Sequence, residues 1–140
     1  ITEWASLGIR DMKGIEVPNH GVASLLLPAG ARGAAFLVFS NFKAIEHYNA
    51  ADAYVIGVGH LADRLKGGDP IQASWPRNDR ALQFAERVEL QQRLTAAGFD
   101  TGGADGKVGP KTVAAVKAYQ KSIGLLPDGY ASLDILTRLR

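Results

Sequence analysis

The sequence has 140 residues, of which 46% are hydrophobic and 21% are charged, a composition close to that of ordinary globular domains. Sixteen basic and fourteen acidic residues leave a net charge of only +2, so no nucleic-acid partner is expected. The sequence has no cysteine, which excludes a disulfide scaffold, a thiolate nucleophile and a cysteine-ligated zinc site.

No apolar run approaches the roughly 20 residues that span a bilayer, and no signal peptide is visible. The chain begins at Ile1 and not at methionine, so we expect it to be a processed or truncated piece of a longer protein.

Two β-prone runs, at 22–27 and 34–39, predict a hairpin with a longer loop that contains proline and glycine. A short helix is predicted from Asn41, a favourable N-cap residue, to about Tyr48. A second helix is predicted over about 51–66. Its apolar positions Tyr54, Val58, Leu61 and Leu65 recur at helical spacing, and Val55 and Ala62 lie beside them.

Two glycines, Gly57 and Gly59, lie inside this second helix, where glycine lowers helix stability. We expect them to permit close packing against another element. Nothing in the sequence obviously supplies that element, so the apolar helix faces predict that the first part of the chain packs poorly alone.

A break is predicted near residues 66–78. The run Gly67-Gly68-Asp69-Pro70 is typical of a helix stop followed by a turn, and Trp75-Pro76 favours an extended step. We therefore expect two domains, 1–77 and 78–140. The second has nine basic and seven acidic residues, so it carries the whole net charge of +2.

The second part predicts three helices. The first covers about 81–97 and ends at Gly98, the second opens at Gly109-Pro110, and the third follows Ser132 as its N-cap. The residues expected to face inward are Leu90, Leu94 and Ala97, then Val113, Val116, Tyr119 and Ile123, then Leu133, Leu136 and Leu139.

An internal repeat supports this interpretation. Asp105-Gly106 precedes Val113 and Val116 by 8 and 11 residues, and Asp128-Gly129 precedes Leu136 and Leu139 by the same offsets. Each Asp-Gly pair is typical of a turn that leads into a helix. Two such units 23 residues apart predict a pseudo-symmetric bundle.

Metal and nucleophile motifs are missing from the sequence. The histidines His20, His47 and His60 lack metal-ligand spacing, and the glycine-rich loop 100–106 would need a glutamate where Thr112 stands to bind calcium as an EF-hand does. No metal or cofactor is therefore expected.

The sequence also offers no glutamate in the apolar surroundings that a general acid for glycan cleavage requires. No glutamate lies in an apolar motif that would raise its pKa and make it a general acid. The glutamates are Glu3, Glu16, Glu46, Glu86 and Glu89.

The pair Tyr48-Asn49 stands where one predicted helix ends and the next begins. Tyrosine offers a stacking face for a sugar ring, and asparagine can donate to and accept from an acetamido group. The residues alone leave two interpretations open, a substrate contact or a cap at the helix joint.

The segments 41–49 and 53–58 resemble the end of the catalytic domain of lytic murein transglycosylases of the B type. The flanking segments 4–9, 25–33, 36–38 and 59–65 and Trp75-Pro76 continue this resemblance. From Leu90-Gln91 onward the chain resembles a type-1 peptidoglycan-binding module. The residues that carry the second resemblance are Leu90, Gln91, Leu94, Gly98, Asp105 to Thr112, Ala115, Val116, Gln120 and Asp128-Gly129.

The resemblance implies a mainly α fold with a small β-hairpin, in which a truncated lysozyme-like catalytic lobe precedes a three-helix peptidoglycan-binding bundle. It implies cleavage of the MurNAc–GlcNAc bond of peptidoglycan without water. One glutamate first acts as acid and then as base, and O6 of MurNAc closes onto C1 to give a 1,6-anhydro sugar. The family's Glu-Ser-x-x-Gly-like motif is not in this sequence, so the catalytic glutamate is expected upstream and none is assigned here.

By the same resemblance Tyr48 and Asn49 are substrate contacts, with Asn41 and Phe42 in the matching segment. Tyr119, Tyr130 and Lys107 are candidate wall contacts, although a core role for Tyr119 is equally open. The expected partner is the glycan strand of peptidoglycan, in the bacterial periplasm or cell envelope. Two alternatives stay open: a non-catalytic wall anchor and a protein-interaction module.

Overall fold

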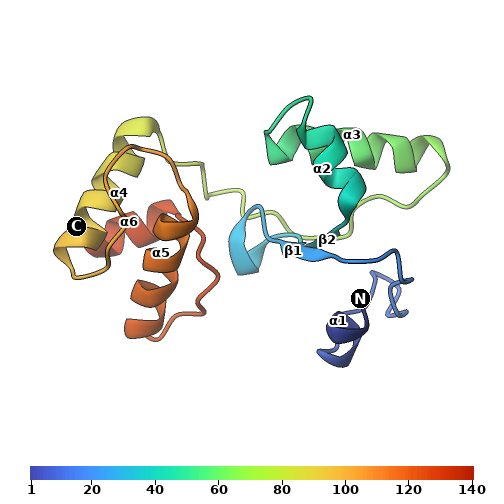
Figure 1. Ribbon diagram of the computed structural model, residues 1–140, viewed down its shortest axis with the longest axis horizontal. Helices are drawn as coiled ribbons and strands as arrows, with labels where there is room; N and C mark the ends of the chain where they lie inside the picture. Colours follow the sequence, from blue (N-terminus) through green and yellow to red (C-terminus); the bar gives the residue numbers. More distant parts are fainter. The chain divides into compact units, whose positions relative to one another are not determined.

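The computed structural model describes residues 1–140. They divide into two compact units, one made of residues 1–28 and 34–74 and the other of residues 29–33 and 75–140 (Figure 1). The second unit thus includes a short piece of the hairpin loop together with the carboxy-terminal helices. None of the helices combines the length and the apolar composition required to cross a membrane.

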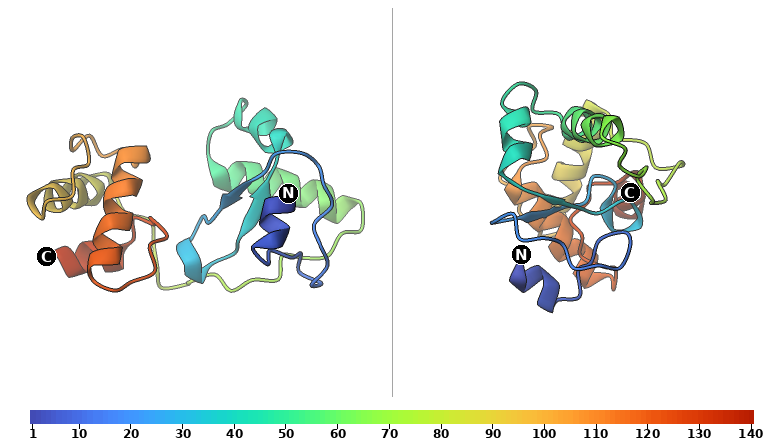
Figure 2. Two further views of the ribbon diagram at one scale, coloured as in Figure 1. Left: turned by 60° about the horizontal axis from the view of Figure 1, so that its bottom comes forward. Right: turned by 90° about the vertical axis from the view of Figure 1, so that its right-hand side faces the viewer.

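The first unit contains a short hairpin and three helices, and Figure 2 shows its two strands lying side by side. Leu25 pairs with Leu37 in the antiparallel register, which confirms the predicted hairpin with shorter strands. The Trp4 indole N–H donates to the carbonyl of Ala23 at 3.0 Å and ties the first helix to the start of the hairpin. The elements are α1 (Thr2–Ser6), β1 (Ser24–Leu26), β2 (Phe36–Val38), α2 (Ser40–Glu46) and α3 (Asp52–Leu65).

The start of α2 differs from the prediction, because Asn41 is not its N-cap. Phe39 takes that position in extended backbone, with φ −110° and ψ −174°, and the helix begins at Ser40. Since β2 ends at Val38, a single extended residue carries the chain from strand to helix. Asn41 therefore lies in the first helical turn, where its Oδ1 accepts the N–H of Phe42 at 3.0 Å.

The apolar face of α3 is exposed, in line with the expectation that no element of the chain would pack on it. α3 contacts α2 and is covered on the side of Val55, which is 1% exposed. A Cβ at Gly57 or Gly59 would meet nothing within 4 Å. The exposed apolar residues are Tyr54, Val58, Leu61 and Leu65.

The second unit contains the three predicted helices, α4 (Phe84–Ala96), α5 (Pro110–Ser122) and α6 (Leu133–Leu139), and the 3-10 turn η1 (Gly30–Arg32). Their ends follow local chemistry, as predicted. Pro110 stands in the first turn of α5, where no backbone N–H is needed. The hydroxyl oxygen of Ser132 accepts the N–H of Ile135 at 3.2 Å and caps α6.

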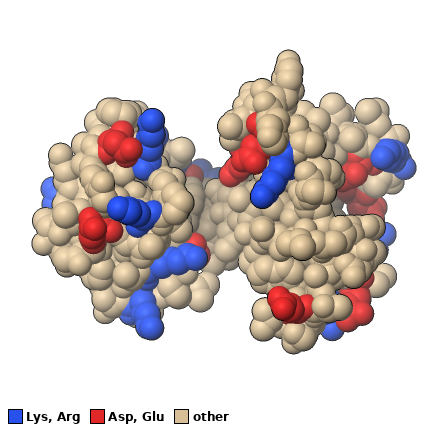
Figure 3. Space-filling view, in the orientation of Figure 1, with Lys and Arg blue, Asp and Glu red and all other residues tan.

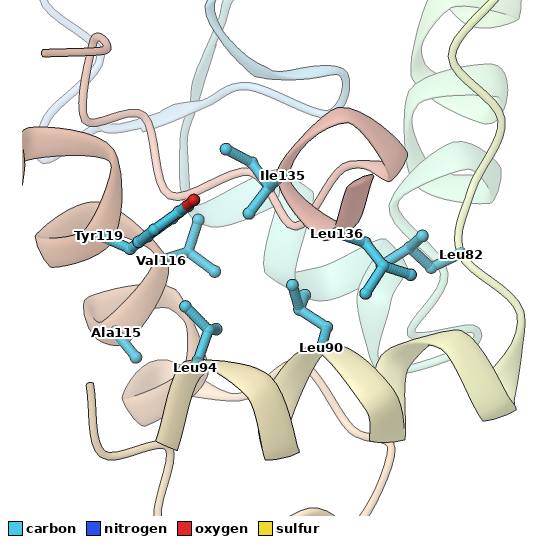
Figure 4. Packing of buried hydrophobic residues seen from close by; sticks show 8 residues of the cluster. All are labelled: Leu82, Leu90, Leu94, Ala115, Val116, Tyr119, Ile135 and Leu136. Carbon is cyan, nitrogen blue, oxygen red and sulfur yellow. The ribbon is translucent and has the colours of Figure 1, made fainter. Parts of the chain in front are cut away.

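A single hydrophobic core joins the three helices of the second unit (Figure 4). Leu90 and Leu94 of α4 point toward α5 and α6, and both are fully buried. The complete buried cluster is Leu82, Leu90, Leu94, Ala115, Val116, Tyr119, Ile135 and Leu136. The mainly helical fold with a small hairpin, predicted from the sequence, is confirmed.

Three residues expected in this core, Ala97, Val113 and Ile123, lie outside it, and Val113 is half-buried beside Gly129. Ala97 is exposed because it follows the last turn of α4, and the backbone turns away at Gly98 with φ +91°. Ile123 is 40% exposed because it follows the last residue of α5. Ala115 and Ile135 contribute to the core in their place.

Candidate functional site

Two tyrosines form an exposed aromatic platform at the junction of α2 and α3. Tyr48 follows α2 and is 83% exposed, while Tyr54 in the first turn of α3 is 38% exposed. Their rings are stacked, with centroids 5.9 Å apart and planes inclined by 29°. In the turn that joins the two tyrosines, Asn49 Oδ1 accepts the N–H of Ala51 at 3.0 Å and so stabilises the turn. The side-chain NH₂ of Asn49 is left as a donor at the surface.

Of the four predicted glycan contacts, the structure brings together only Tyr48 and Asn49. Asn41 and Phe42 lie in the first turn of α2, at the opposite end of that helix. Tyr48 comes seven positions after Asn41, which corresponds to about 10 Å at the rise of an α-helix. Asn41 is exposed and Phe42 is half-buried.

Sequence reasoning missed Tyr54 as a partner of Tyr48, because it considered Tyr54 only as one of the apolar positions along the helix. The signal that could have found it is the sequence separation of the two rings. Tyr54 comes six residues after Tyr48, just past the turn at Asn49, so a tight turn returns one aromatic ring to the other.

The two glutamates of α4 are held as carboxylates by arginine. Two guanidinium nitrogens of Arg80 donate to Glu86 at 2.6 and 2.7 Å and, with the N–H of Gln83, lower its pKa to about 2. Arg140 and then Arg93 lower the pKa of Glu89 to about 2 in the same way. A general acid must keep its proton near the working pH, so neither glutamate suits that role.

A buried glutamine binds the first Asp-Gly turn of the second unit. Gln91 of α4 is 2% exposed, and its Oε1 accepts the N–H of Gly106 at 2.8 Å. The two N–H groups of its Nε2 are shared among three acceptors, Asp105 Oδ1 at 3.2 Å, the carbonyl of Lys107 at 3.0 Å and Thr112 Oγ1 at 3.1 Å. The same Asp105 oxygen accepts the N–H of Lys107 at 2.9 Å.

A second glutamine repeats this arrangement one helix later. Gln120 of α5 is 4% exposed, and its Oε1 accepts the N–H of Gly129 at 2.9 Å. Its Nε2 donates to Asp128 Oδ1 at 2.6 Å, and that oxygen also accepts the N–H of Tyr130 at 2.9 Å. The repeat seen in the sequence is therefore a repeat of contacts as well, and we call each set of glutamine, Asp-Gly pair and following residue a clamp.

Sequence reasoning named both glutamines only as carriers of the family resemblance and did not assign them these contacts. Gln91 lies 14 residues before Asp105, and Gln120 lies 8 residues before Asp128, so no constant spacing reveals the pairs. The available signal was a glutamine next to a core position in each helix, since Leu90 and Tyr119 precede them.

The second clamp also binds a piece of the hairpin loop. Asp128 Oδ2 accepts the N–H of Ala31 at 2.8 Å. Gly30 has φ +67°, and a Cβ built there would lie 2.7 Å from Asp128 Oδ2 and 3.0 Å from Tyr130 Cβ, so only glycine fits. Arg32 of the same segment lies 3.8 Å from the Asp79 carboxylate, measured from Nη2 to Oδ2.

Electrostatics around the second clamp follow from this packing. Burial raises the pKa of Tyr130, and the nearby carboxylates of Asp79 and Asp128 raise it further. Burial opposes ionisation of Asp128 too, but hydrogen bonds from the backbone N–H groups of Ala31 and Tyr130 and from the Gln120 amide together lower its pKa.

The three predicted wall contacts of the second unit lie in different settings. Tyr119 is 9% exposed and meets Phe99 edge to face at 5.6 Å, so it has the core role that the sequence left open. Tyr130 is half-buried and Lys107 is exposed. Lys107 and Tyr130 occupy equivalent positions in the two clamps, directly after the Asp-Gly pair.

The surface and the histidines show no sign of an ion or polyanion site. Figure 3 shows lysine and arginine side chains interspersed with acidic ones over the visible face of α4–α6. No three or more His, Asp or Glu side chains gather into a group that could hold a metal ion. His20 packs edge to face on Phe39 at 5.6 Å, and His47 Nδ1 lies 2.7 Å from the carbonyl oxygen of Lys43.

Comparison with known proteins matches both parts of the chain. Residues 1–63 match the family described as "Transglycosylase SLT domain", and residues 85–139 match the family described as "Putative peptidoglycan binding domain". No curated protein gives a significant sequence match.

Two crystal structures of SltB3 from Pseudomonas aeruginosa are similar to the whole chain, one in complex with NAG-anhNAM-pentapeptide and one with NAG-NAM-pentapeptide. In each case the identity is 46%, the TM-score is 0.93, and the match covers 99% of this chain and 38% of SltB3. The chain thus spans well under half the length of SltB3.

These findings confirm the resemblance to B-type lytic transglycosylases that the sequence predicted. Over 99% of its length the chain is similar to SltB3, and its two parts match the transglycosylase SLT domain family and the peptidoglycan-binding domain family in that order.

Proposed function

We propose that this chain binds peptidoglycan as part of a lytic transglycosylase, which cleaves the MurNAc–GlcNAc bond without water and leaves 1,6-anhydroMurNAc ends. The observation that carries the proposal is the alignment of 99% of the chain with SltB3, whose crystals hold a NAG-NAM-pentapeptide and its anhydro counterpart. The SLT and peptidoglycan-binding families matched by the two parts of the chain support it.

We place the catalytic-domain portion at 1–77 and the peptidoglycan-binding domain at 78–140. Domains that act on peptidoglycan imply a location in the cell envelope. Within the envelope, the proposed location is the bacterial periplasm, where the enzyme would meet its glycan strands.

The platform of Tyr48 and Tyr54 is proposed to hold a sugar ring of the glycan. An exposed ring face packs against the C–H face of a pyranose and loses little conformational entropy in doing so. The surface NH₂ group of Asn49, next to the platform, can donate to the carbonyl of an acetamido group. Asn41 and Phe42 would contact a more distant part of the strand, because they lie at the far end of α2.

By itself the chain is proposed to bind the wall without cleaving it. The glutamates of α4 are carboxylates with pKa values of about 2, and the Glu-Ser-x-x-Gly-like motif of the family is not in the sequence. Glu86 and Glu89 are thus surface ion-pair partners in this proposal and not catalytic residues. A wall-binding role without catalysis is therefore the second candidate function for the chain taken alone.

Cosedimentation with purified sacculi tests the proposal directly. The chain should pellet with insoluble peptidoglycan, and the supernatant should contain no anhydro-muropeptides by chromatography and mass spectrometry. Release of anhydro ends at a steady rate would contradict the inactivity of the isolated chain. A chain that stays in the supernatant would contradict peptidoglycan binding.

A pair of substitutions tests the aromatic platform. Tyr48→Ala removes the stacking face and should weaken binding of glycan strands stripped of peptide by about fivefold, whereas Tyr48→Phe keeps the face and should bind nearly as well. Tyr48 is 83% exposed, so neither change should alter the fold. Equal binding by both variants would remove the platform from the proposal.

A further inference from the structure

We propose that the carboxylate of Asp105 accepts a backbone amide N–H from the peptide part of peptidoglycan, a proposal that rests on the function proposed above. It assigns to the second unit both a binding position and the chemical class of the ligand group. The ligand is a peptide segment whose residue at the clamp has a small side chain.

The first argument is that the two clamps have the same arrangement of hydrogen bonds. In each, a glutamine oxygen accepts the glycine N–H, at 2.8 Å from Gly106 and 2.9 Å from Gly129. In each, one aspartate oxygen accepts both the glutamine amide and the N–H two residues on. Both aspartates are therefore oriented by two donors on Oδ1, which leaves Oδ2 directed away from the clamp.

The second argument is that one of these free oxygens is occupied. Asp128 Oδ2 accepts the N–H of Ala31 at 2.8 Å, from a segment 97 residues away in the sequence. Gly30 rests against Tyr130, the residue that follows the Asp-Gly pair. The second clamp thus already binds a segment of its own chain, and the residues of that segment at the contact are Gly30 and Ala31.

The third argument is that the first clamp has the same acceptor without a partner. Asp105 is exposed, and its Oδ2 accepts no hydrogen bond from any other residue. A carboxylate oriented by its neighbours pays little entropy when it binds a donor, so its affinity for an N–H group is higher than that of a mobile surface aspartate.

The surroundings of Asp105 suit a peptide with small aliphatic side chains. The Phe84 ring lies against Gly106, where a Cβ would come within 2.5 Å of it, and 62% of this side chain is exposed. Val108, 42% exposed, follows Lys107 in the same loop. The apolar ring and the valine provide contacts for methyl groups, and the exposed Lys107 can pair with a carboxylate of the ligand.

The decisive variant is Asp105→Asn. Its Oδ1 can still accept from Lys107 and Gln91, so the turn is retained, but the outer oxygen becomes an NH₂ donor that repels an incoming N–H. We expect the apparent Kd of the full chain for intact sacculi to rise about tenfold, the change typical for loss of a hydrogen bond to a charged group. The matched control is Asp100→Asn, because Asp100 accepts the N–H of Gly102 at 2.8 Å in a similar exposed turn that has no clamp.

Binding is measured by cosedimentation with intact sacculi and with glycan strands freed of peptide by an amidase. Thermal melting of each variant confirms that it folds. The proposal expects a loss for Asp105→Asn on intact sacculi alone and no loss for Asp100→Asn. Unchanged binding of Asp105→Asn to intact sacculi overturns this inference while peptidoglycan binding stands, and an equal loss on peptide-free strands overturns the peptide assignment. If the unsubstituted chain fails to bind sacculi, the proposed function itself is wrong.

Discussion

At the residue scale, Gln91 connects one helix to the loop that precedes the next. It forms four hydrogen bonds and is almost completely buried, so its replacement leaves several polar groups unpaired. Gln91→Leu should lower the free energy of unfolding of the second unit by about 3 kcal/mol, because each unsatisfied buried group costs about 1–3 kcal/mol. Urea denaturation followed by circular dichroism measures this change.

The adjacent exposed residue provides the control. Gln92→Leu makes the same chemical change on the solvent side of α4 and should alter the free energy of unfolding by less than about 0.5 kcal/mol. Similar values for the two variants would mean that the first clamp contributes little to stability.

Residue-scale prediction from the sequence was partial for a physical reason. The Asp-Gly turns were predicted because their signals are local, as Asp105 and Gly106 are neighbours in the chain. The glutamines bind across 14 and 8 residues, through pairings that depend on how the helices pack. Tyr48 and Asn49 were recognised, but the stacking of Tyr54 on Tyr48 required the turn geometry.

At the element scale, α3 carries glycines that no other element approaches. Gly57 has ordinary helical torsions and open space around it, so Gly57→Ala should raise the stability of α3 in this chain by about 0.5–1 kcal/mol. Hydrogen exchange of the α3 amides measures the gain. A loss of protection would mean that another surface packs closely on Gly57 in solution.

For Gly98 we expect the opposite effect of a change to alanine, although the space around this residue is as open as that around Gly57. Its φ is +91°, a conformation that alanine adopts only with strain, although nothing lies within 4 Å of a Cβ there. Gly98→Ala should therefore destabilise the second unit by about 1 kcal/mol in chemical denaturation. Open space alone does not decide the effect of a glycine substitution, because the backbone torsion matters as much.

Ion pairs link α4 to its surroundings and predict a pH dependence. The pKa values of Glu86 and Glu89 are about 2, below the ordinary value of 4.5, because of Arg80 and Arg140 respectively. The stability from these pairs is present above about pH 4.5 and is lost as the pH falls toward 2, since the unfolded chain then binds protons more strongly. The melting temperature of the second unit should fall across this range.

Removal of the carboxylates checks this cause. In the double variant Glu86→Gln and Glu89→Gln the fall in melting temperature between pH 4.5 and pH 2 should become shallower. An unchanged slope would assign the pH dependence to other carboxylates of the unit.

The elements themselves were largely predictable from the sequence, whereas their buried faces were less so. Helical spacing located α3 and its apolar positions Tyr54, Val58, Leu61 and Leu65, and these residues are exposed in the structure. Periodicity shows that a helix has an apolar side, and only the packing partner decides whether that side is buried. In the second unit the partners are present, and Leu90, Leu94, Val116 and Leu136 are buried as predicted.

At the scale of the whole molecule, the two units differ in how much apolar surface they bury. The buried hydrophobic residues of the first unit are Ala34 and Val55, whereas the second unit buries eight in one cluster. The first unit should therefore unfold at a lower temperature than the second, because hydrophobic burial is the main favourable term in folding.

Limited proteolysis and calorimetry test this order. Brief digestion should remove the amino-terminal segments first and leave a resistant fragment that contains α4–α6. Calorimetry should show two transitions. Simultaneous loss of both units would indicate that they unfold as one cooperative body.

The peptide bond between Gly30 and Ala31 has a consequence for any transplantation of the carboxy-terminal helices into another protein. A fragment cut at residue 78 would leave Asp128 Oδ2 exposed to water where it now accepts the Ala31 N–H. A synthetic pentapeptide with the sequence of residues 29–33, added in trans, would restore that donor. Transfer of the three helices alone would therefore remove one hydrogen bond of the second clamp, and a design that keeps this contact must also carry the 3-10 segment 29–33.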